Sequence, residues 1–159
     1  MLCLREVRFR NVFTASGTLN FFGQGWPHHK ICRAITGFDF SGSTFVAKTT
    51  TLSPRKGNMP LNKKLQPREL LPDCIKVFPF KRVVLNSVGL SGPGAQVLFS
   101  AGKWQKRTKP FFISFMAGGE TEKQRLKEME LFVLLLEKQL PFFKTHVGLE
   151  INVSCPNTE

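Results

Sequence analysis

The sequence predicts an α/β fold that corresponds to the N-terminal half of a (β/α)8 TIM-type barrel. Four apolar, strand-like segments alternate with stretches of helical spacing: residues 12–15, 44–51, 111–116 and 147–153. The last segment runs into a polar stretch, and parallel barrels carry their active sites at the C-terminal ends of their strands. A full barrel needs about 250 residues and no internal repeat supplies more strands. We therefore expect residues 1–159 to form one partial barrel domain, as an N-terminal fragment, a split gene product or a truncated prediction.

The first elements are short. Apolar residues alternate over 4–9 before a polar Arg10-Asn11 corner, which predicts a hairpin that leads into the first strand. Gly23, Gly25 and Pro27 then interrupt the chain ahead of a short helix over 28–35. The second strand, 44–51, is β-branched and apolar, as buried parallel strands are.

A long irregular insertion follows the second strand. Prolines recur between Pro54 and Pro72 too often for a helix to form. From Cys74 to Leu85 the pattern is strand-like again, with an interruption at Pro79. We expect this insertion to extend above the sheet.

The second half of the chain has the clearest helix. A shorter helix is predicted from Gly92 to Ala101, before the aromatic third strand. The longer one runs over 121–140, with Thr121 as its N-cap and Pro141 as its stop. Its apolar residues fall at helical spacing and predict a core face that covers the sheet between the third and fourth strands: Leu126, Met129, Phe132, Val133, Leu136 and Leu140.

Composition narrows the classes of partner. The net charge of +12 and the pI near 10.0 permit nucleic-acid binding. The basic residues are scattered in short groups without a recognisable nucleic-acid module, so we expect a solvated surface and no nucleic-acid partner. The cysteines form no Cys-x-x-Cys pair, so no metal site is predicted. No secretory leader is recognisable, and the aliphatic run Leu131–Leu136 is too short to cross a bilayer, which predicts a soluble cytoplasmic protein.

The polar stretch after the fourth strand carries the strongest chemical signal. Cys155 stands between the carboxamides of Asn152 and Asn157, and Pro156 stiffens the turn. Carboxamides both donate and accept hydrogen bonds, which suits a planar, amide-rich ligand. A thiol in this position indicates an enzyme.

The run Asn-Val-Ser-Cys-Pro-Asn at 152–157 resembles the active-site segment of dihydroorotate dehydrogenases, flavin enzymes of de novo pyrimidine biosynthesis. Four further segments resemble that family in order and spacing, so that the resemblance covers about residues 7–157. They are 13–17 (Phe-Thr-Ala-Ser-Gly), 46–52 (Val-Ala-Lys-Thr-Thr-Thr-Leu) with 55–58 (Arg-Lys-Gly-Asn), 86–90 (Asn-Ser-Val-Gly-Leu) and 110–115 (Pro-Phe-Phe-Ile-Ser-Phe).

This resemblance implies a cofactor and a reaction. The cofactor is flavin mononucleotide (FMN), which takes a hydride from dihydroorotate while Cys155 removes a proton as the base. Lys48, a charge in an otherwise apolar strand, would stabilise negative charge that develops on the flavin ring. The implied cofactor-binding residues are Ala15, Ser16, Gly17, Lys48, Thr49 and Asn152.

The resemblance also implies how the substrate is held. Asn86 would bond the pyrimidine, and the backbone N–H groups of the loop after it would face the substrate carboxylate. Gly89 leaves that loop free to turn its backbone. The implied substrate-binding residues are Lys48, Asn86, Ser87, Val88, Gly89, Leu90, Asn152 and Asn157.

Several alternatives stay open at this stage. Cys155 favours the soluble branch of the family, because the quinone-using branch has serine at this position. The stretch 48–51, in contrast, resembles the quinone-using branch. The electron acceptor and a homodimer in the complete enzyme are thus undetermined. A dihydropyrimidine dehydrogenase-like flavin enzyme, a non-catalytic barrel fragment that acts as an assembly module, and a basic nucleic-acid-binding domain are the competing functions.

Overall fold

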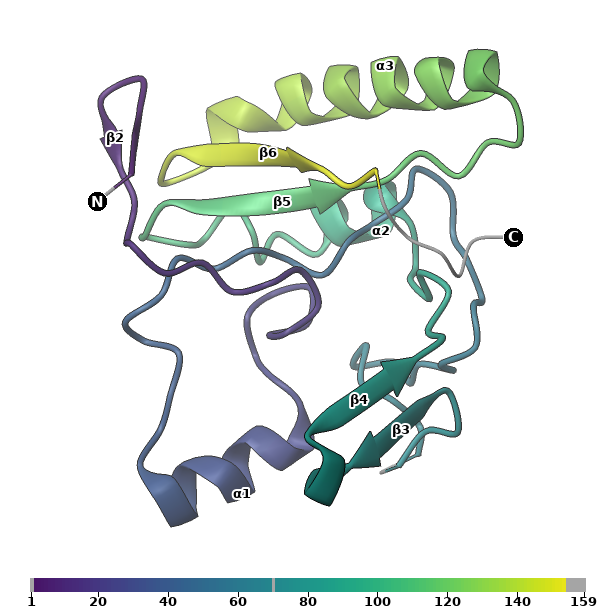
Figure 1. Ribbon diagram of the computed structural model, residues 1–159. Coiled ribbons are helices and arrows are strands. Elements are labelled where there is room, and N and C mark those ends of the chain that lie inside the picture. The colour runs from purple at the N-terminus through teal and green to yellow at the C-terminus, as the bar shows by residue number, and fades with distance from the viewer. Residues whose placement is uncertain (1, 70, 154–159) are drawn as a thin grey trace.

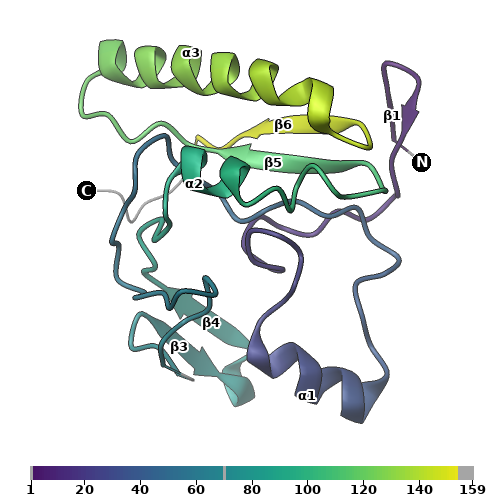
Figure 2. The same cartoon turned by 180° about the vertical axis from the view of Figure 1, so that it is seen from behind.

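The computed structural model describes residues 2–69 and 71–153. Two parallel strands, β5 (Phe111–Phe115) and β6 (Val147–Ile151), form its central sheet, and two small antiparallel hairpins lie apart from it. Helices α2 (Ala95–Ser100) and α3 (Glu122–Gln139) lie against the sheet, and α3 runs along its outer face (Figure 1). On the opposite side, α1 (Pro27–Thr36) and a hairpin extend away from the sheet, as the reverse view in Figure 2 also shows.

The parallel strand order agrees with the prediction. Residues 12–14 align with the second segment through a parallel bridge from Phe13 to Thr44. The second segment aligns with β5 through the parallel bridge from Val46 to Phe112, and β5 pairs with β6 along its whole length. Four extended segments therefore lie side by side in chain order and in parallel. Closure into a barrel stays a prediction, because the described residues form only part of an α/β domain.

The first two predicted strands are correct in position but wrong in regularity. Neither 12–15 nor 44–51 forms a continuous strand; each pairs only through isolated bridges. The bridges at Val46–Phe112 and Thr50–Phe115 enclose one more residue in the second segment than in β5. The N–H of Ala47 donates to the carbonyl of Phe112, and a regular parallel strand would next donate from residue 49. The bond to the carbonyl of Ser114 comes instead from Thr50, so the extra residue forms a β-bulge. The bulge lies at Lys48 and Thr49.

The core between sheet and helices is aromatic. Strand alternation points Phe111, Ile113 and Phe115 of β5 to the helix side, where all three are fully buried. The ring of Phe115 stacks on Phe132 of α3, with centroids 4.0 Å apart. Trp104 is also fully buried, and its indole N–H donates to the carbonyl of residue 21 at 2.6 Å. These contacts fix α3 on the sheet.

Helix α3 confirms its predicted ends but not its whole predicted face. Thr121 is the N-cap and forms a capping box with Gln124. The 3-10 turn η2 (Leu140–Phe142), which contains Pro141, ends the helix. Phe132 and Leu136 are buried, whereas Leu126 is 60% and Leu140 46% exposed, so the predicted core face was wrong at both ends. The helix is longer than the short sheet that it covers.

The predicted N-terminal hairpin is present as β1 (Cys3–Leu4) and β2 (Val7–Arg8). Phe9 follows it and packs on the ring of Phe112, with centroids 4.9 Å apart. An open hollow of about 610 Å³ lies beside this hairpin. Its lining includes Leu2, Leu4, Phe13, Val46, Phe112 and Glu150. The hairpin thus covers one end of the inner face of the parallel segments.

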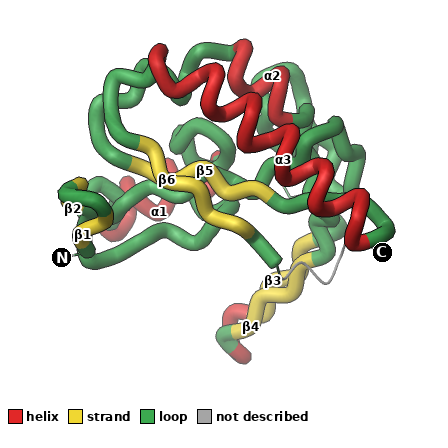
Figure 3. Tube along the Cα trace, turned by 90° about the horizontal axis from the view of Figure 1, so that it is seen from above, coloured by secondary structure: helices red, strands yellow, loops and turns green. Residues whose placement is uncertain are grey.

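The insertion after the second segment is extended, as predicted, and has no helix or strand over the described part of 54–72. The strand-like pattern over 74–85 and its interruption at Pro79 are confirmed: the chain forms two strands, β3 (Ile75–Phe78) and β4 (Val83–Asn86), which pair as an antiparallel hairpin. The short 3-10 turn η1 (Pro79–Lys81) and Arg82, whose φ is +53°, reverse the chain. Pro79 lacks an N–H group, so it favours a turn over a continuing strand. Figure 3 shows this hairpin standing clear of the sheet.

Helix α1 confirms the predicted helix with one further residue at each end. No residue of α1 is buried. Among the described residues, no helix has both the length and the apolar composition that a membrane span requires.

Acid should loosen the start of α1. The backbone N–H of Trp26 donates to Nδ1 of His29 at 3.2 Å, which requires that this nitrogen carry no proton. Desolvation lowers the pKa of His29 from its ordinary value of 6.5, and the charge of His28 lowers it further. The unfolded chain therefore binds more protons, and α1 loses stability as the pH falls below about 6.5. The amide resonance of Trp26 should shift over this range, and His29→Gln should abolish the shift.

The exposed His146 provides the control for this titration. His146→Gln should leave the response of the Trp26 amide unchanged. A Trp26 amide that titrates normally in His29→Gln would contradict the assignment.

Candidate functional site

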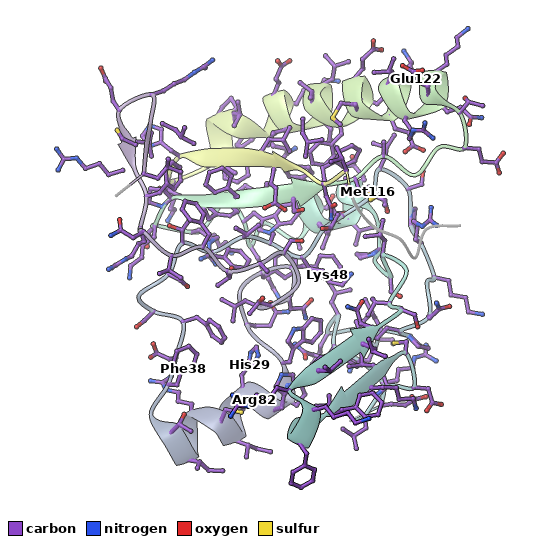
Figure 4. All side chains as sticks on the ribbon, viewed as in Figure 1. His29, Phe38, Lys48, Arg82, Met116 and Glu122 are labelled. Carbon is purple, nitrogen blue, oxygen red and sulfur yellow. The ribbon has the colours of Figure 1, made fainter. Side chains whose placement is uncertain are left out.

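The candidate site lies where the parallel segments end. Lys48 and Thr49 occupy the bulge of the second segment, Ser16 follows the first, Ser114 lies near the end of β5, and Asn152 directly follows β6. Figure 4 places Lys48 between the β5–β6 sheet and the β3–β4 hairpin. The carboxyl ends of parallel strands are where α/β folds collect their catalytic groups.

The hydroxyl of Thr49 joins all four segments. Its Oγ1 lies 2.9 Å from Oγ of Ser16 and 2.9 Å from Oγ of Ser114, and it accepts a hydrogen bond from Nδ2 of Asn152 at 3.0 Å. A hydroxyl donates once and accepts twice, so these three bonds saturate it. Thr49 is 4% exposed. The network therefore fixes the rotamer of Thr49 and the direction in which the Asn152 amide points.

Lys48 is a buried cation, with a side chain that is only 6% exposed. Its ammonium donates to the backbone carbonyl of Ser91 at 2.7 Å and lies 4.9 Å from the ring centroid of Phe21. The ring face and the carbonyl oxygen both stabilise a positive charge. Burial of an ammonium costs several kcal/mol, on the order of the penalty for other buried ions.

The loop that follows β4 presents backbone donors. Gly89 and Leu90 both have positive φ, +66° and +58°, and both are buried. No described residue accepts a hydrogen bond from the backbone N–H of Val88, Gly89 or Leu90. Buried backbone donors are almost always paired, so this set is suited to an external acceptor such as an anion.

Comparison with known proteins gives one informative similarity. No protein-family model matches the chain. The chain is 29% identical over 151 residues to the protein named dihydroorotate dehydrogenase B (NAD(+)), catalytic subunit, of Desulforudis audaxviator. The aligned region covers 93% of this chain and 38% of that relative. The chain is a distant homologue of an oxidoreductase subunit.

The structure brings together part of the predicted site. Ser16, Lys48, Thr49 and Asn152 converge as expected from the sequence, with Gly17 beside Lys48. Ala15 is exposed and borders the hollow near the N-terminal hairpin. The loop residues after β4 approach the same region through the bond from Lys48 to Ser91, although Asn86 and Ser87 are themselves exposed. Cys155 and Asn157 lie outside the described residues.

Sequence reasoning missed three polar residues of this site. Ser114 interrupts an aromatic strand, and its polarity on the inner face was a usable signal. Asn58 lies in the matching segment 55–58, but no role followed from that match, and Ser91 gave no signal. The partners of both residues lie about 30 residues away in sequence, at Ser87 for Asn58 and at Met59 for Ser91. Both contacts depend on how the insertion folds back on the loop.

Proposed function

We propose that the chain supplies part of an FMN-dependent oxidoreductase that oxidises dihydroorotate to orotate. The observation that carries this proposal is the buried Lys48, whose ammonium binds the carbonyl of Ser91. Ser91 directly follows a loop whose N–H groups, at Val88, Gly89 and Leu90, lack described acceptors. An anionic, planar substrate next to a cofactor that becomes negatively charged would use both features. The homology to a dihydroorotate dehydrogenase subunit supports the same reaction.

The residues at the ends of the first two segments suit a flavin. Gly17 has φ +91°, and a Cβ added there would meet only Cγ of Lys48, at 4.0 Å. Small side chains at Ala15, Ser16 and Gly17 would let a flat ring approach the backbone closely. Together with Thr49 and Asn152, they would hold the ring of FMN, which supplies the hydride acceptor when bound. Phosphate sites of such barrels commonly follow strands seven and eight.

Lys48 supplies positive charge where the reaction develops negative charge. Its Nζ is held at the carbonyl of Ser91 and over the ring of Phe21 before any ligand binds. Preorganised charges of this kind need no reorganisation in the transition state, which makes them effective in catalysis. The bulge at Lys48 directs this side chain out of the regular strand pattern.

The loop after β4 would bind the substrate. The N–H groups of Val88, Gly89 and Leu90 would receive the carboxylate, and Asn86 would bond the pyrimidine ring with Asn152 and Asn157. A charged substrate uses these donors, whereas the uncharged bases of a dihydropyrimidine dehydrogenase-like enzyme leave them unpaired. This difference favours dihydroorotate over the uncharged alternative.

Cys155 would remove the proton as the general base. It follows β6 by four residues and is close in sequence to Asn152, whose amide Thr49 holds in place. A thiolate can act near neutral pH where neighbouring cations and hydrogen bonds lower its pKa. The proton and the hydride leave adjacent carbons of the substrate, so the base and the flavin must lie close to the same ring.

The assembly-module alternative also has an observation in its favour. The β3–β4 hairpin exposes the paired side chains of Val77 and Val84 on one face and those of Phe78 and Val83 on the other. Exposed apolar clusters of this kind mark interaction surfaces. A module without catalysis would use this hairpin and would bind no flavin.

A flavin assay separates these functions. The protein expressed from its complete gene should purify with a flavin absorbance spectrum, and dihydroorotate should bleach that spectrum under anaerobic conditions. Dihydrouracil, which lacks the carboxylate, should bleach it much more slowly. A colourless protein that does not take up added FMN would refute the proposed function and leave the assembly module.

A further inference from the structure

We propose that Asn58 is a positioning residue that sets the direction of the substrate-loop N–H groups without touching the substrate. The inference rests on the proposed function for its kinetic consequence, and on the contacts of Asn58 for its geometry. The backbone N–H of Asn58 donates to the carbonyl of Val88 at 2.9 Å. The side-chain Nδ2 donates to the carbonyl of Ser87 at 2.7 Å. One residue thus binds two consecutive carbonyls of the loop.

These two bonds determine where the loop donors point. In a planar trans peptide the C=O and the following N–H point in opposite directions. Because Asn58 binds the carbonyls of Ser87 and Val88, the N–H groups of Val88 and Gly89 point away from Asn58. These are two of the donors that no described residue accepts from. Asn58 therefore orients the groups that would receive a carboxylate.

Neighbours of Asn58 hold the same loop. The backbone N–H of Met59 donates to Oγ of Ser91 at 3.0 Å, and that hydroxyl donates to the carbonyl of Val88 at 3.0 Å. Further along, Arg55 and Gly92 exchange two backbone hydrogen bonds of 2.9 Å each. Since Lys48 bonds the carbonyl of Ser91, this clamp also fixes the acceptor of the buried ammonium.

Gly57 explains how the clamp comes so close. Its φ is +51°, and a Cβ there would overlap Oγ of Ser91 and lie 2.6 Å from the carbonyl of Val88 and 2.8 Å from that of Gly89. Only glycine allows the segment to press against the loop backbone. The close contact between residues 55–59 and this loop therefore depends on glycine at position 57.

The side chain of Asn58 can be tested alone. Asn58→Ala keeps the backbone N–H and removes only the bond to Ser87, and the residue is exposed, so the fold should tolerate the change. Asn62→Ala is the matched control: Asn62 lies in the same insertion, and its Oδ1 accepts only from the nearby N–H groups of Lys64 and Gln66. Both variants are made in the protein expressed from its complete gene.

We expect the variants to differ in binding and loop exchange. Asn58→Ala should raise the KM for dihydroorotate about 5-fold, as the loss of one hydrogen bond does, with kcat and flavin content retained. Amide hydrogen exchange at Met59 and Gly92, whose N–H groups are bonded between the insertion and the loop, should quicken in the same variant. Asn62→Ala should change neither quantity. Gly57→Ala should have the same effect as Asn58→Ala but a larger one, since it moves the loop backbone itself.

The outcomes separate the two proposals. If Asn58→Ala matches Asn62→Ala in both KM and exchange, the positioning role is refuted while dihydroorotate oxidation stands. If the wild-type protein does not oxidise dihydroorotate but exchange at Met59 and Gly92 still rises only in Asn58→Ala, the proposed function is refuted and the positioning of the loop stands.

Discussion

Replacing Lys48 with alanine should slow flavin reduction by dihydroorotate about 10²-fold or more, which is the typical loss when one preorganised electrostatic group is removed. The charge of Lys48 matters most as negative charge builds up on the ring, so the rate should fall more than substrate affinity. Stopped-flow reduction measures the rate, and equilibrium titration with orotate measures the affinity.

Two further variants make this result specific. Lys48→Met keeps most of the buried volume beside Phe21 and removes the charge, so it should slow the reaction as much as alanine does. Lys103→Ala removes an exposed lysine whose Nζ lies 5.0 Å from the ring centroid of Phe22, and it should leave the rate unchanged. Reduction of Lys48→Met at the wild-type rate would remove this charge from the mechanism.

Local signals predicted the regular parts of the fold. The apolar spacing and capping residues of α3 gave its ends almost to the residue, because Thr121 and Pro141 act through neighbours in sequence. The aromatic run of β5 likewise predicted a buried strand, because the pattern lies in five consecutive residues. The direction of every one of the four segments followed from the alternation of strands with helices.

Long-range contacts determine the features of the fold that local sequence patterns did not predict. The bulge at Lys48 depends on which N–H of the second segment meets β5, and no local pattern encodes that choice. The length of the sheet under α3 leaves Leu126 and Leu140 exposed although their spacing matches a core face. Likewise, the clamp from Asn58 to Ser87 joins segments that the sequence shows only as loops.

The site was predicted as residues but not as a network. Matching segments indicated Ser16, Lys48, Thr49 and Asn152 individually. That the hydroxyl of Thr49 connects Ser16, Ser114 and Asn152 follows only from their distances, and it gives Thr49 a structural role beside any cofactor contact.

Cys155 is expected to be the proton-abstracting base, so the rate of flavin reduction should rise with pH through a single ionisation of this thiol. The base must be deprotonated to act, which fixes the sign of the pH dependence. Cys155→Ser keeps nearly the same size but offers an alcohol, a far weaker acid than a thiol. The variant should bind flavin, react about 10²-fold more slowly or worse, and show its ionisation at higher pH.

A second thiol near the site provides the control for this titration. Burial raises the pKa of Cys74, whose carbonyl accepts the N–H of Ser87, so its ionisation should not coincide with that of a base that works near neutral pH. Cys74→Ser should therefore leave the pH profile of the rate unchanged. If Cys155→Ser and Cys155→Ala both keep the wild-type rate and profile, another residue is the base. Orotate affinity should survive in both variants of Cys155, because the carboxamides that would hold the ring and the loop N–H groups that would hold the carboxylate remain.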